Sequence, residues 1–408
     1  MKGYIHRYLE SAVLRISKTF PVLLLTGPRQ VGKTTLLQYL IAQEGKKRGY
    51  VSLDDFKTRT LANEDPALFL QQNPSPLLID EVQYAPKLFT YIKIAVDRDR
   101  NNGMYWLTGS QQFHMMKGVS ESLAGRVGIL SLLGLSQAEI DGMPQKEEPW
   151  MPGAAAKAEG TSTTAIFSKI IKGSFPALFQ DQAPKLDEYY GAYLRTYVDR
   201  DVRDIIKVTS LASFEKFVSV CAARTASLLN YSDLARDADI SVPTAKEWMS
   251  ILEAGHHVFL LRPYYRNLTK RLIKAPKLYF LDTGLAAYLT GWRDPGTALR
   301  GAYAGQLFET LIISEIIKSY VHRGKDPRFF SYFRTKEQEE VDFLIDQNGI
   351  LTPVEVKLGM QVNKADLRGV EALKATKTKV GLGAVIAPVE APYHLNQDVI
   401  VEPPSAIS

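Results

Sequence analysis

The nine residues GPRQVGKTT at 27–35 constrain the fold of this chain more than any other stretch. They follow the apolar run VLLLT and precede LLQYLIAQ, so a strand should enter the loop and a helix should leave it. The spacing fits the pattern G-x-x-x-x-G-K-[ST], in which glycines let backbone N–H groups surround phosphates and the helix directs its positive end at them. We therefore predict a nucleotide-binding loop made of Gly27, Pro28, Arg29, Gln30, Val31, Gly32, Lys33, Thr34 and Thr35.

Two side chains of this loop have specific expected roles. Lys33 would contact the β- and γ-phosphates, and the Thr34 hydroxyl would bind Mg²⁺, so ATP and Mg²⁺ are the expected cofactors. The alternative is a chance match within a glycine turn. The strand before, the helix after and the complete pattern together favour the phosphate site.

Short apolar runs recur through the first 140 residues, at 22–26, 50–54, 76–80 and 104–110. Each run is continuous and is followed by a loop, as central strands of a parallel sheet are. Residues 1–140 are therefore predicted to form an α/β domain around a parallel sheet.

Polar residues follow two of these runs. PLLID ends in Asp80 and is followed by Glu81, at the sheet edge where α/β folds bind ligands. Asp80 would hold Mg²⁺, and Glu81 would orient and activate the attacking water. The run MYWLTGS brings Thr108, Ser110 and Gln111 to the same edge, and we expect Ser110 to approach the γ-phosphate or the water, with a plain turn as the alternative.

These stretches together resemble the AAA+ superfamily of P-loop NTPases, and more closely the prokaryotic AAA family ATPases that carry a conserved C-terminal domain of unknown function. The matching stretches are GPRQVGKTT, LLIDEVQ, LTGS and SLAGRVGILSLLGLSQAEI. In AAA+ assemblies an arginine of one subunit completes the γ-phosphate site of its neighbour. The resemblance therefore implies that Arg126 is this arginine, acting in trans within a homo-oligomeric ring, a hexamer. From spacing alone, a surface arginine that caps a helix end would be preferred.

The resemblance continues in GSFPALF, YLRTYVDRDVRDI and KLYFLDTGLAAYLTG, with one departure at Ala226, where related sequences tend to carry glycine. Between the matching parts, residues 141–165 are rich in Ala, Gly, Pro and Thr and are predicted to form a linker or surface loop. A helical, winged-helix domain is expected at 166–300 and a small α/β domain at 301–408.

Residues 231–258 have the outline of a helix-turn-helix, with one helix over 232–239, a tight turn and a second helix from Val242. Ser241 would cap the second helix, and the later runs VFLLRPYY and KAPKLYFLD would form the strands of a wing. DNA is the expected partner, and a protein is the alternative. The expected DNA contacts are Lys246, Arg262, Arg266, Lys270, Arg271 and Lys274, with Lys277, Tyr264 and Tyr265 in the same stretch.

The stretch EVDFLIDQNGILTPVEVK at 340–357 alternates apolar and polar residues on both sides of Asn-Gly, which predicts two strands joined by a tight turn. A largely apolar helix at 305–320 precedes it, and FFSYFRT should form another strand. A helix with Glu, a strand with Asp and a strand with Glu-x-Lys resemble the PD-(D/E)XK nuclease fold, a restriction-endonuclease-like domain. The resemblance implies a site of Glu309, Asp342, Glu355 and Lys357, with Asp342 and Glu355 binding the metal.

Two alternatives to this nuclease site remain open. The carboxylates could be the solvated face of an ordinary hairpin, and several domains of this fold bind DNA without cutting it. The polar pattern alone is common in proteins, whereas the helix and the strand order together are harder to obtain by chance.

Composition sets the remaining limits. The 408 residues carry a net charge of +6, which favours a polyanionic partner. A single cysteine, Cys221, excludes an intrachain disulfide and fits a reducing cytoplasm. No apolar run approaches the roughly 20 residues needed to cross a bilayer, so a cytoplasmic protein without a membrane partner is expected.

Three hypotheses follow from the sequence. The first is a Mg²⁺-dependent AAA+-like ATPase that translocates or remodels duplex or branched DNA and carries a nuclease-like DNA-binding domain. The second is a slow ATP-controlled switch that binds DNA or protein, with a nuclease-like domain that does not cleave. The third is a metal-dependent deoxyribonuclease that ATP licenses.

Overall fold

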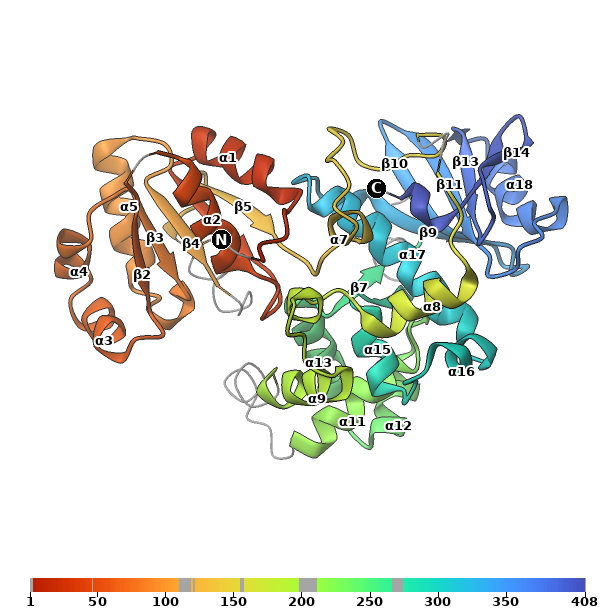
Figure 1. Ribbon diagram of the computed structural model, residues 1–408, viewed down its shortest axis with the longest axis horizontal. Helices are drawn as coiled ribbons and strands as arrows, with labels where there is room; N and C mark the ends of the chain where they lie inside the picture. The colour runs from red at the N-terminus through yellow and green to blue at the C-terminus, as the bar shows by residue number, and fades with distance from the viewer. Residues whose placement is uncertain are drawn as a thin grey trace.

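The computed structural model describes residues 3–45, 47–109, 119, 122–154, 158–197, 211–265 and 274–407. Figure 1 shows an amino-terminal domain at the left, a mostly helical middle domain below and a carboxyl-terminal domain at the upper right. Among the described residues, no helix combines the length and the apolar character needed to span a bilayer.

The amino-terminal domain is built on a parallel five-stranded sheet in the order β2-β3-β4-β1-β5, which confirms the predicted parallel sheet. Successive residues of β1 face opposite ways: Leu23 and Leu25 pack with α1 and α2, whereas Val22 and Leu24 pack with α4 and α5. Helices on both faces explain why the central strands are apolar throughout. The strands are β1 (Val22–Thr26), β2 (Gly49–Ser52), β3 (Leu77–Asp80), β4 (Tyr105–Thr108) and β5 (Val127–Ser131). The helices are α1 (Leu9–Thr19), α2 (Lys33–Gln43), α3 (Phe56–Glu64), α4 (Pro66–Gln72) and α5 (Leu88–Asp99).

The fifth strand was not among the predicted apolar runs. It lies at an edge of the sheet, where one face is only partly covered, and Ile129 is 39% exposed.

The middle domain packs helices around an antiparallel three-stranded sheet in the order β6-β8-β7. The predicted helix-turn-helix is present as α12 and α13. Asp239 takes a left-handed conformation (φ 58°) after α12, and Ser241 accepts a hydrogen bond from the Thr244 N–H (3.2 Å) at the start of α13. The helices are α8 (Thr163–Lys172), α9 (Leu186–Tyr197), α11 (Leu211–Ala222), α12 (Tyr231–Ala238), α13 (Val242–Ala254), α15 (Thr283–Leu289) and α16 (Pro295–Arg300). The short helix α7 (Gln137–Ile140) precedes them and lies next to the later helix that carries Glu315. The strands are β6 (Ser227–Leu228), β7 (Val258–Leu261) and β8 (Lys277–Phe280).

The carboxyl-terminal domain packs the long helix α17 against a mixed sheet in the order β14-β15-β13-β11-β10-β9, with β12 beside β11. The predicted hairpin is confirmed: β10 pairs antiparallel with β11, and Asn348 and Gly349 form the turn with φ of 55° and 79°. The helices are α17 (Ala304–Val321) and α18 (Arg368–Ala375). The strands are β9 (Phe330–Arg334), β10 (Glu340–Gln347), β11 (Ile350–Val356), β12 (Lys379–Val380), β13 (Gly383–Ile386), β14 (Tyr393–Asn396) and β15 (Val399–Glu402).

The segment 141–165, predicted to be a linker or surface loop, is irregular over most of its described length but packs along the carboxyl-terminal domain. Trp150 is buried, its carbonyl accepts a hydrogen bond from the Tyr320 hydroxyl (3.2 Å), and the Gly153 N–H donates to Glu402 (3.2 Å). The low-complexity composition could not reveal these contacts, since they involve residues far away in the sequence.

Candidate functional site

The loop between β1 and α2 has the geometry that its glycines predict. Gly27 has φ 139°, and a Cβ atom there would lie 2.0 Å from the Leu132 carbonyl oxygen, so only glycine fits. Gly32 has φ 90° and directly precedes α2. The N–H groups of the first turn of α2 therefore face the loop.

Lys33 is buried, and its ammonium donates to two carbonyls of its own loop, Gly27 (2.9 Å) and Pro28 (2.7 Å). These bonds hold the positive charge within the curve of the loop. A bound phosphate would meet the ammonium there, as the sequence predicts.

Asp80 ends β3, is buried and accepts hydrogen bonds from hydroxyl groups. The donors are Thr34 (2.7 Å), Tyr50 (3.3 Å) and Thr108. In the part of the chain that the structure describes, none of the side chains that hydrogen-bond to Asp80 is cationic. Its negative charge is therefore available to a metal ion, and Thr34 lies beside it as a second oxygen ligand.

Glu81 follows in a left-handed conformation (φ 56°), which is uncommon for a residue other than glycine. Its N–H donates to the Thr108 hydroxyl (3.2 Å), and its carboxylate accepts from the side chain of Gln83. Thr108 thus contacts the carboxylate of Asp80 and the backbone of Glu81. The sequence placed Thr108 at this edge but favoured Ser110, which lies outside the described residues.

A cavity of about 370 Å³ opens over the loop, and the middle domain contributes to it through Thr196 of α9. Burial and the nearby charge of Lys33 also lower the pKa of His256, which follows α13, to about 4. The middle domain therefore borders the phosphate site through Thr196 and near His256. The sequence analysis placed neither residue at this site. The lining residues are Arg29, Gln30, Gly32, Lys33, Thr34, Thr35, Glu81 and Thr196.

A second cavity of about 380 Å³ lies next to the loop and shares Gly32 and Thr35 with the first. It is lined mainly by apolar groups, among them Ile5, Val31 and Pro176. Arg7 fixes this wall by donating to the Val31 carbonyl (2.8 Å) while pairing with buried Glu139 (3.2 Å).

Arg126 lies at the opposite edge of the sheet from the loop. Its carbonyl accepts from the Val22 N–H (3.2 Å) at the start of β1, whereas the loop follows the end of this strand. A strand of this length spans about 16 Å, so Arg126 cannot contact a phosphate bound in its own chain. Its guanidinium pairs with Asp97 of α5 (2.5 and 3.0 Å) and lowers the pKa of that carboxyl.

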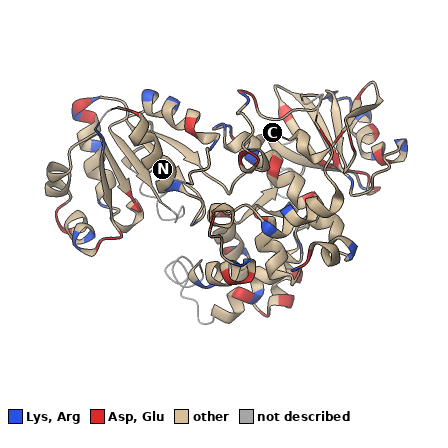
Figure 2. Ribbon diagram, viewed as in Figure 1, with Lys and Arg blue, Asp and Glu red and all other residues tan. Residues whose placement is uncertain are grey.

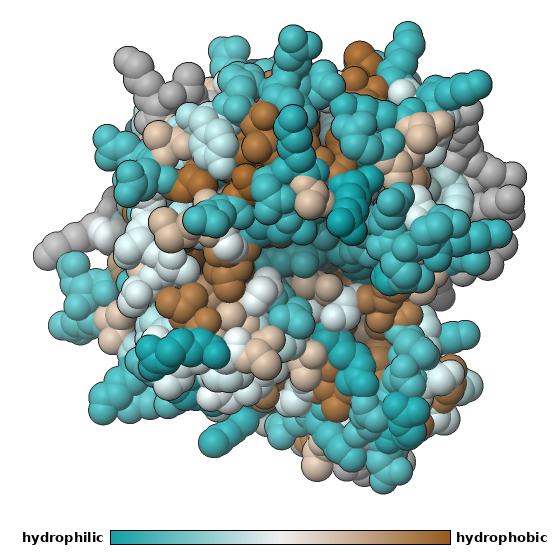
Figure 3. Space-filling model, turned by 90° about the vertical axis from the view of Figure 1, so that its right-hand side faces the viewer, coloured by the Kyte–Doolittle hydropathy of each residue, from teal (hydrophilic) through white to brown (hydrophobic). Residues whose placement is uncertain are grey.

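The predicted DNA contacts are only partly within the described residues, because Arg266, Lys270 and Arg271 lie outside them. Lys246 is exposed on α13, but Glu247 and Glu253 are exposed on the same helix, and Figure 2 shows acidic segments among the basic ones in this domain. The face in Figure 3 is mostly hydrophilic, with scattered hydrophobic patches.

The four nuclease-like residues come from the three predicted elements and lie close together. Glu309 is on α17 and Asp342 on β10, while Glu355 is on β11 and Lys357 directly follows that strand. Asp342 accepts from the Val356 N–H (3.0 Å), and the Lys357 ammonium is 3.8 Å from Glu355. Burial, and then the charge of Asp342, raise the pKa of Glu355 well above its usual value.

An unpredicted lysine occupies this carboxylate cluster. Lys277, at the start of β8, places its ammonium 3.3 Å from Glu309 and 3.3 Å from Asp342, and it also pairs with Glu340. Lys277 is only 4% exposed, so its grouping with the DNA-facing cations of the wing was wrong. Among the described residues, no three His, Cys, Asp or Glu side chains are arranged to hold a metal ion. Metal binding by Asp342 and Glu355 stays a prediction.

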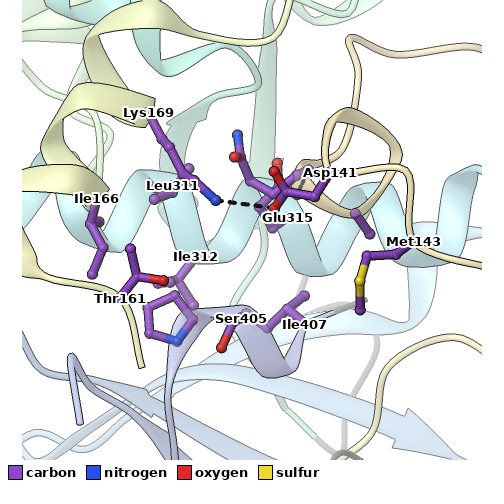
Figure 4. Close-up of a pocket in the computed structure, with 13 residues that line it drawn as sticks. Asp141, Met143, Thr161, Ile166, Lys169, Leu311, Ile312, Glu315, Ser405 and Ile407 are labelled. Carbon is purple, nitrogen blue, oxygen red and sulfur yellow. Dashed lines mark hydrogen bonds and ion pairs between the residues drawn. The ribbon is translucent and has the colours of Figure 1, made fainter. Parts of the chain in front are cut away.

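A smaller cavity of about 120 Å³ lies where α7, α8, α17 and the carboxyl terminus meet (Figure 4). Its charged groups already have partners within the protein: Lys169 pairs with Asp141 (3.2 Å), and Glu315 with Lys318 (2.9 Å). Its size and these pairings make it a poorer candidate for a nucleotide than the cavities at the loop.

Three family models match consecutive parts of the chain. Residues 19–141 match a model described as an AAA domain. The amino-terminal domain is therefore an AAA-type P-loop ATPase domain. Residues 164–296 and 304–405 match two domains of unknown function, DUF8612 and DUF4143.

Whole-chain relatives include uncharacterized proteins of Mycobacterium tuberculosis and Mycobacterium bovis. Each is 27% identical over 337 residues, which cover 83% of this chain and 70% of the relative. Similar solved structures include a Walker-type ATPase of Pyrococcus abyssi (TM-score 0.44, 14% identity, 70% of this chain and 96% of that one). Another is the RuvB Holliday junction branch migration motor of Thermotoga maritima (TM-score 0.31, 17% identity, 62% of this chain and 87% of that one). Both TM-scores lie below 0.5, so these similarities carry no argument about function.

Proposed function

We propose that this protein binds ATP with Mg²⁺ and hydrolyses it in the cavity between the phosphate loop and α9. The observation that carries the proposal is the convergence of Lys33, Asp80 and Glu81 at the carboxyl edge of one parallel sheet. A lysine, a carboxylate with a neighbouring hydroxyl, and a second carboxylate are the groups that phosphoryl transfer to water requires.

Each of these residues has a separate task in the proposed reaction. Lys33 neutralises charge on the β- and γ-phosphates, while Asp80 and Thr34 hold Mg²⁺. Glu81 orients the attacking water and accepts its proton. Thr108 positions both carboxylates, because its hydroxyl donates to Asp80 and accepts from the Glu81 N–H.

The cavity beside the loop suits the adenine base. It adjoins the phosphate site through Gly32 and Thr35, and its walls are mainly apolar. No carboxylate lines it in the described part of the chain, which disfavours guanine, whose N–H groups are commonly bound by an acid.

Substitution of Glu81 tests the hydrolytic role. We expect Glu81→Gln to lower the rate of ATP turnover by about 10²- to 10⁴-fold, the usual contribution of a general base, while a fluorescent ATP analogue still binds. The matched control is Glu64→Gln, an exposed glutamate on α3. Unchanged turnover in Glu81→Gln would exclude this residue as the base.

We also propose that the protein forms a ring in which Arg126 of one copy completes the site of the next. The position of Arg126 at the edge of the sheet opposite to its own loop supports this proposal. Mixing inactive Lys33→Met chains with Arg126→Ala chains should restore part of the turnover, since some mixed interfaces combine an intact loop with an intact arginine.

DNA is the proposed partner, contacted by the wing rather than by α13. The acids on α13 would repel backbone phosphates, whereas the sequence from Arg262 to Lys274 contains five basic residues and no acid. Changing Arg262 and Lys274 to Ser should weaken DNA binding in fluorescence anisotropy and reduce its salt dependence. An unchanged affinity would favour a protein partner for the wing.

A further inference from the structure

The carboxylate cluster of the carboxyl-terminal domain receives its cation from another domain. Glu309, Glu340 and Asp342 belong to α17 and β10, whereas the ammonium between them belongs to Lys277 of the middle domain. Tyr279, two residues further along β8, adds a hydrogen bond from its hydroxyl to Glu309 (2.6 Å). One strand of the middle domain therefore contributes two groups to this cluster.

This lysine is fixed in place rather than mobile at the surface. Because β8 is the central strand of its sheet, the backbone of Lys277 lies opposite Leu228 of β6 on one side and Leu261 of β7 on the other. The two domains also join through a buried hydrogen bond between Thr225 and Thr310 (2.9 Å). The ammonium thus stays among the carboxylates as long as the domains remain docked.

A divalent ion would have to compete with this ammonium for the cluster. Mg²⁺ requires carboxylate oxygens at about 2.1 Å, and the same Glu309 and Asp342 oxygens are already bonded to Lys277. A metal ion on these oxygens would lie within about 4 Å of the ammonium, where like charges in a buried site repel strongly.

A fourth carboxylate, Glu355, makes no ion pair with Lys277 among the described residues. Glu355 is only 3% exposed, and within the described part of the chain its Oε1 atom has no hydrogen-bond partner. Asp342 lies beside this carboxylate. Removal of Lys277 would leave Glu309, Asp342 and Glu355 without a buried cation.

We infer that Lys277 is a built-in cation that takes the place of a metal ion in the carboxylate cluster. The docked middle domain thereby keeps the nuclease-like residues metal-free and unable to cleave DNA. The proposal does not depend on ATP hydrolysis, since both its contacts and its test require no nucleotide.

Binding of Mn²⁺ to the full-length, nucleotide-free protein tests this inference, with free Mn²⁺ measured by electron paramagnetic resonance. We expect Lys277→Met to bind Mn²⁺ at least about tenfold more tightly than the wild type, because one buried positive charge is removed. Adding Asp342→Asn to that variant should abolish the gain. The matched control is Lys379→Met, which removes an exposed lysine on β12 of the same domain.

Two results would overturn the inference. The first is that the wild type binds Mn²⁺ and that Asp342→Asn, as a single substitution, removes this binding. Mn²⁺-dependent plasmid cleavage by the wild type that Asp342→Asn abolishes would count in the same way. The second is a folded Lys277→Met protein that binds Mn²⁺ no better than Lys379→Met. If Lys277→Met does not fold by circular dichroism, the comparison of the wild type with Asp342→Asn decides the question.

Discussion

The phosphate loop and the carboxylate cluster both place a buried lysine near carboxylates, but the two ammonium groups have different partners. Lys33 donates to two backbone carbonyls of its own loop, and nearby Asp80 accepts from hydroxyls. Lys277 instead pairs with three carboxylates of another domain. The first site keeps a carboxylate available for Mg²⁺, whereas the second has its charge compensated from within the chain.

This difference shows that residue types alone do not identify a metal site. Both sites contain a lysine and two or more acids, as the sequence indicated. The two sites differ in whether the ammonium of the protein pairs with the acids, because an ammonium on these carboxylates repels a divalent ion and competes with it. In the proposed function, the phosphate loop takes its metal ion and an arginine of a neighbouring copy from outside the chain, whereas Lys277 supplies a cation to the cluster from within it.

The largest expected effect concerns Arg126, which the proposed ring would place in the site of a neighbouring copy. Arg126→Ala should lower ATP turnover by about 10³- to 10⁵-fold, as loss of an arginine that stabilises the transferring phosphoryl group does. Stability should change little, since Arg126 and Asp97 are both partly exposed. Steady-state phosphate release measures the effect, with Arg98→Ala on α5 as the control.

The stability of two lysine variants directly tests the contrast between the two sites. Lys277→Met should lower the free energy of unfolding by about 3–5 kcal/mol, since it leaves buried carboxylates without their cation. Lys33→Met should lower it less, by about 1 kcal/mol for each of the two hydrogen bonds to backbone carbonyls that it removes. Urea denaturation monitored by circular dichroism compares them, and equal losses would contradict the contrast.

A substitution of Thr108 tests whether its hydroxyl supports the proposed nucleotide site. Thr108→Val keeps the shape of the side chain but removes the hydroxyl that contacts Asp80 and the Glu81 N–H. Turnover should fall about 10- to 100-fold, as it does when groups that orient metal ligands are lost. Thr60→Val, at a partly exposed threonine on α3, should have no such effect.

The smallest effect is a pH dependence within the carboxylate cluster. Burial, and then the charge of Asp342, raise the pKa of Glu309 from 4.5 to about 7. Between these values the folded protein binds more protons than the unfolded chain, so stability falls as the pH rises through this window. The contribution lost between pH 5.5 and 7.5 is about 2 kcal/mol.

Urea denaturation at both pH values measures this dependence. Glu309→Gln should remove this fall in the free energy of unfolding between the two pH values. Glu64→Gln should keep it, since Glu64 is exposed on α3. An identical slope in the wild type and Glu309→Gln would show that Glu309 does not titrate in this range.

The sequence alone determined the local parts of this protein. The phosphate loop, the acids after β3, the cap of α13 and the Asn-Gly hairpin all depend on neighbours along the chain, through backbone dihedral angles and short-range hydrogen bonds. Apolar periodicity was also sufficient to predict the parallel sheet, except for the edge strand β5, where burial is partial.

Only the tertiary structure decided which distant groups meet. Thr196 lines the nucleotide cavity, Arg126 lies at the far edge of the sheet, and Lys277 reaches an aspartate 65 positions away in the sequence. Such contacts depend on how whole domains pack, and a basic residue in a wing strand has the same sequence signature whether it faces DNA or a buried carboxylate. The position of one ammonium group was therefore not readable from the sequence, although it distinguishes a metal site from a cluster that supplies its own cation.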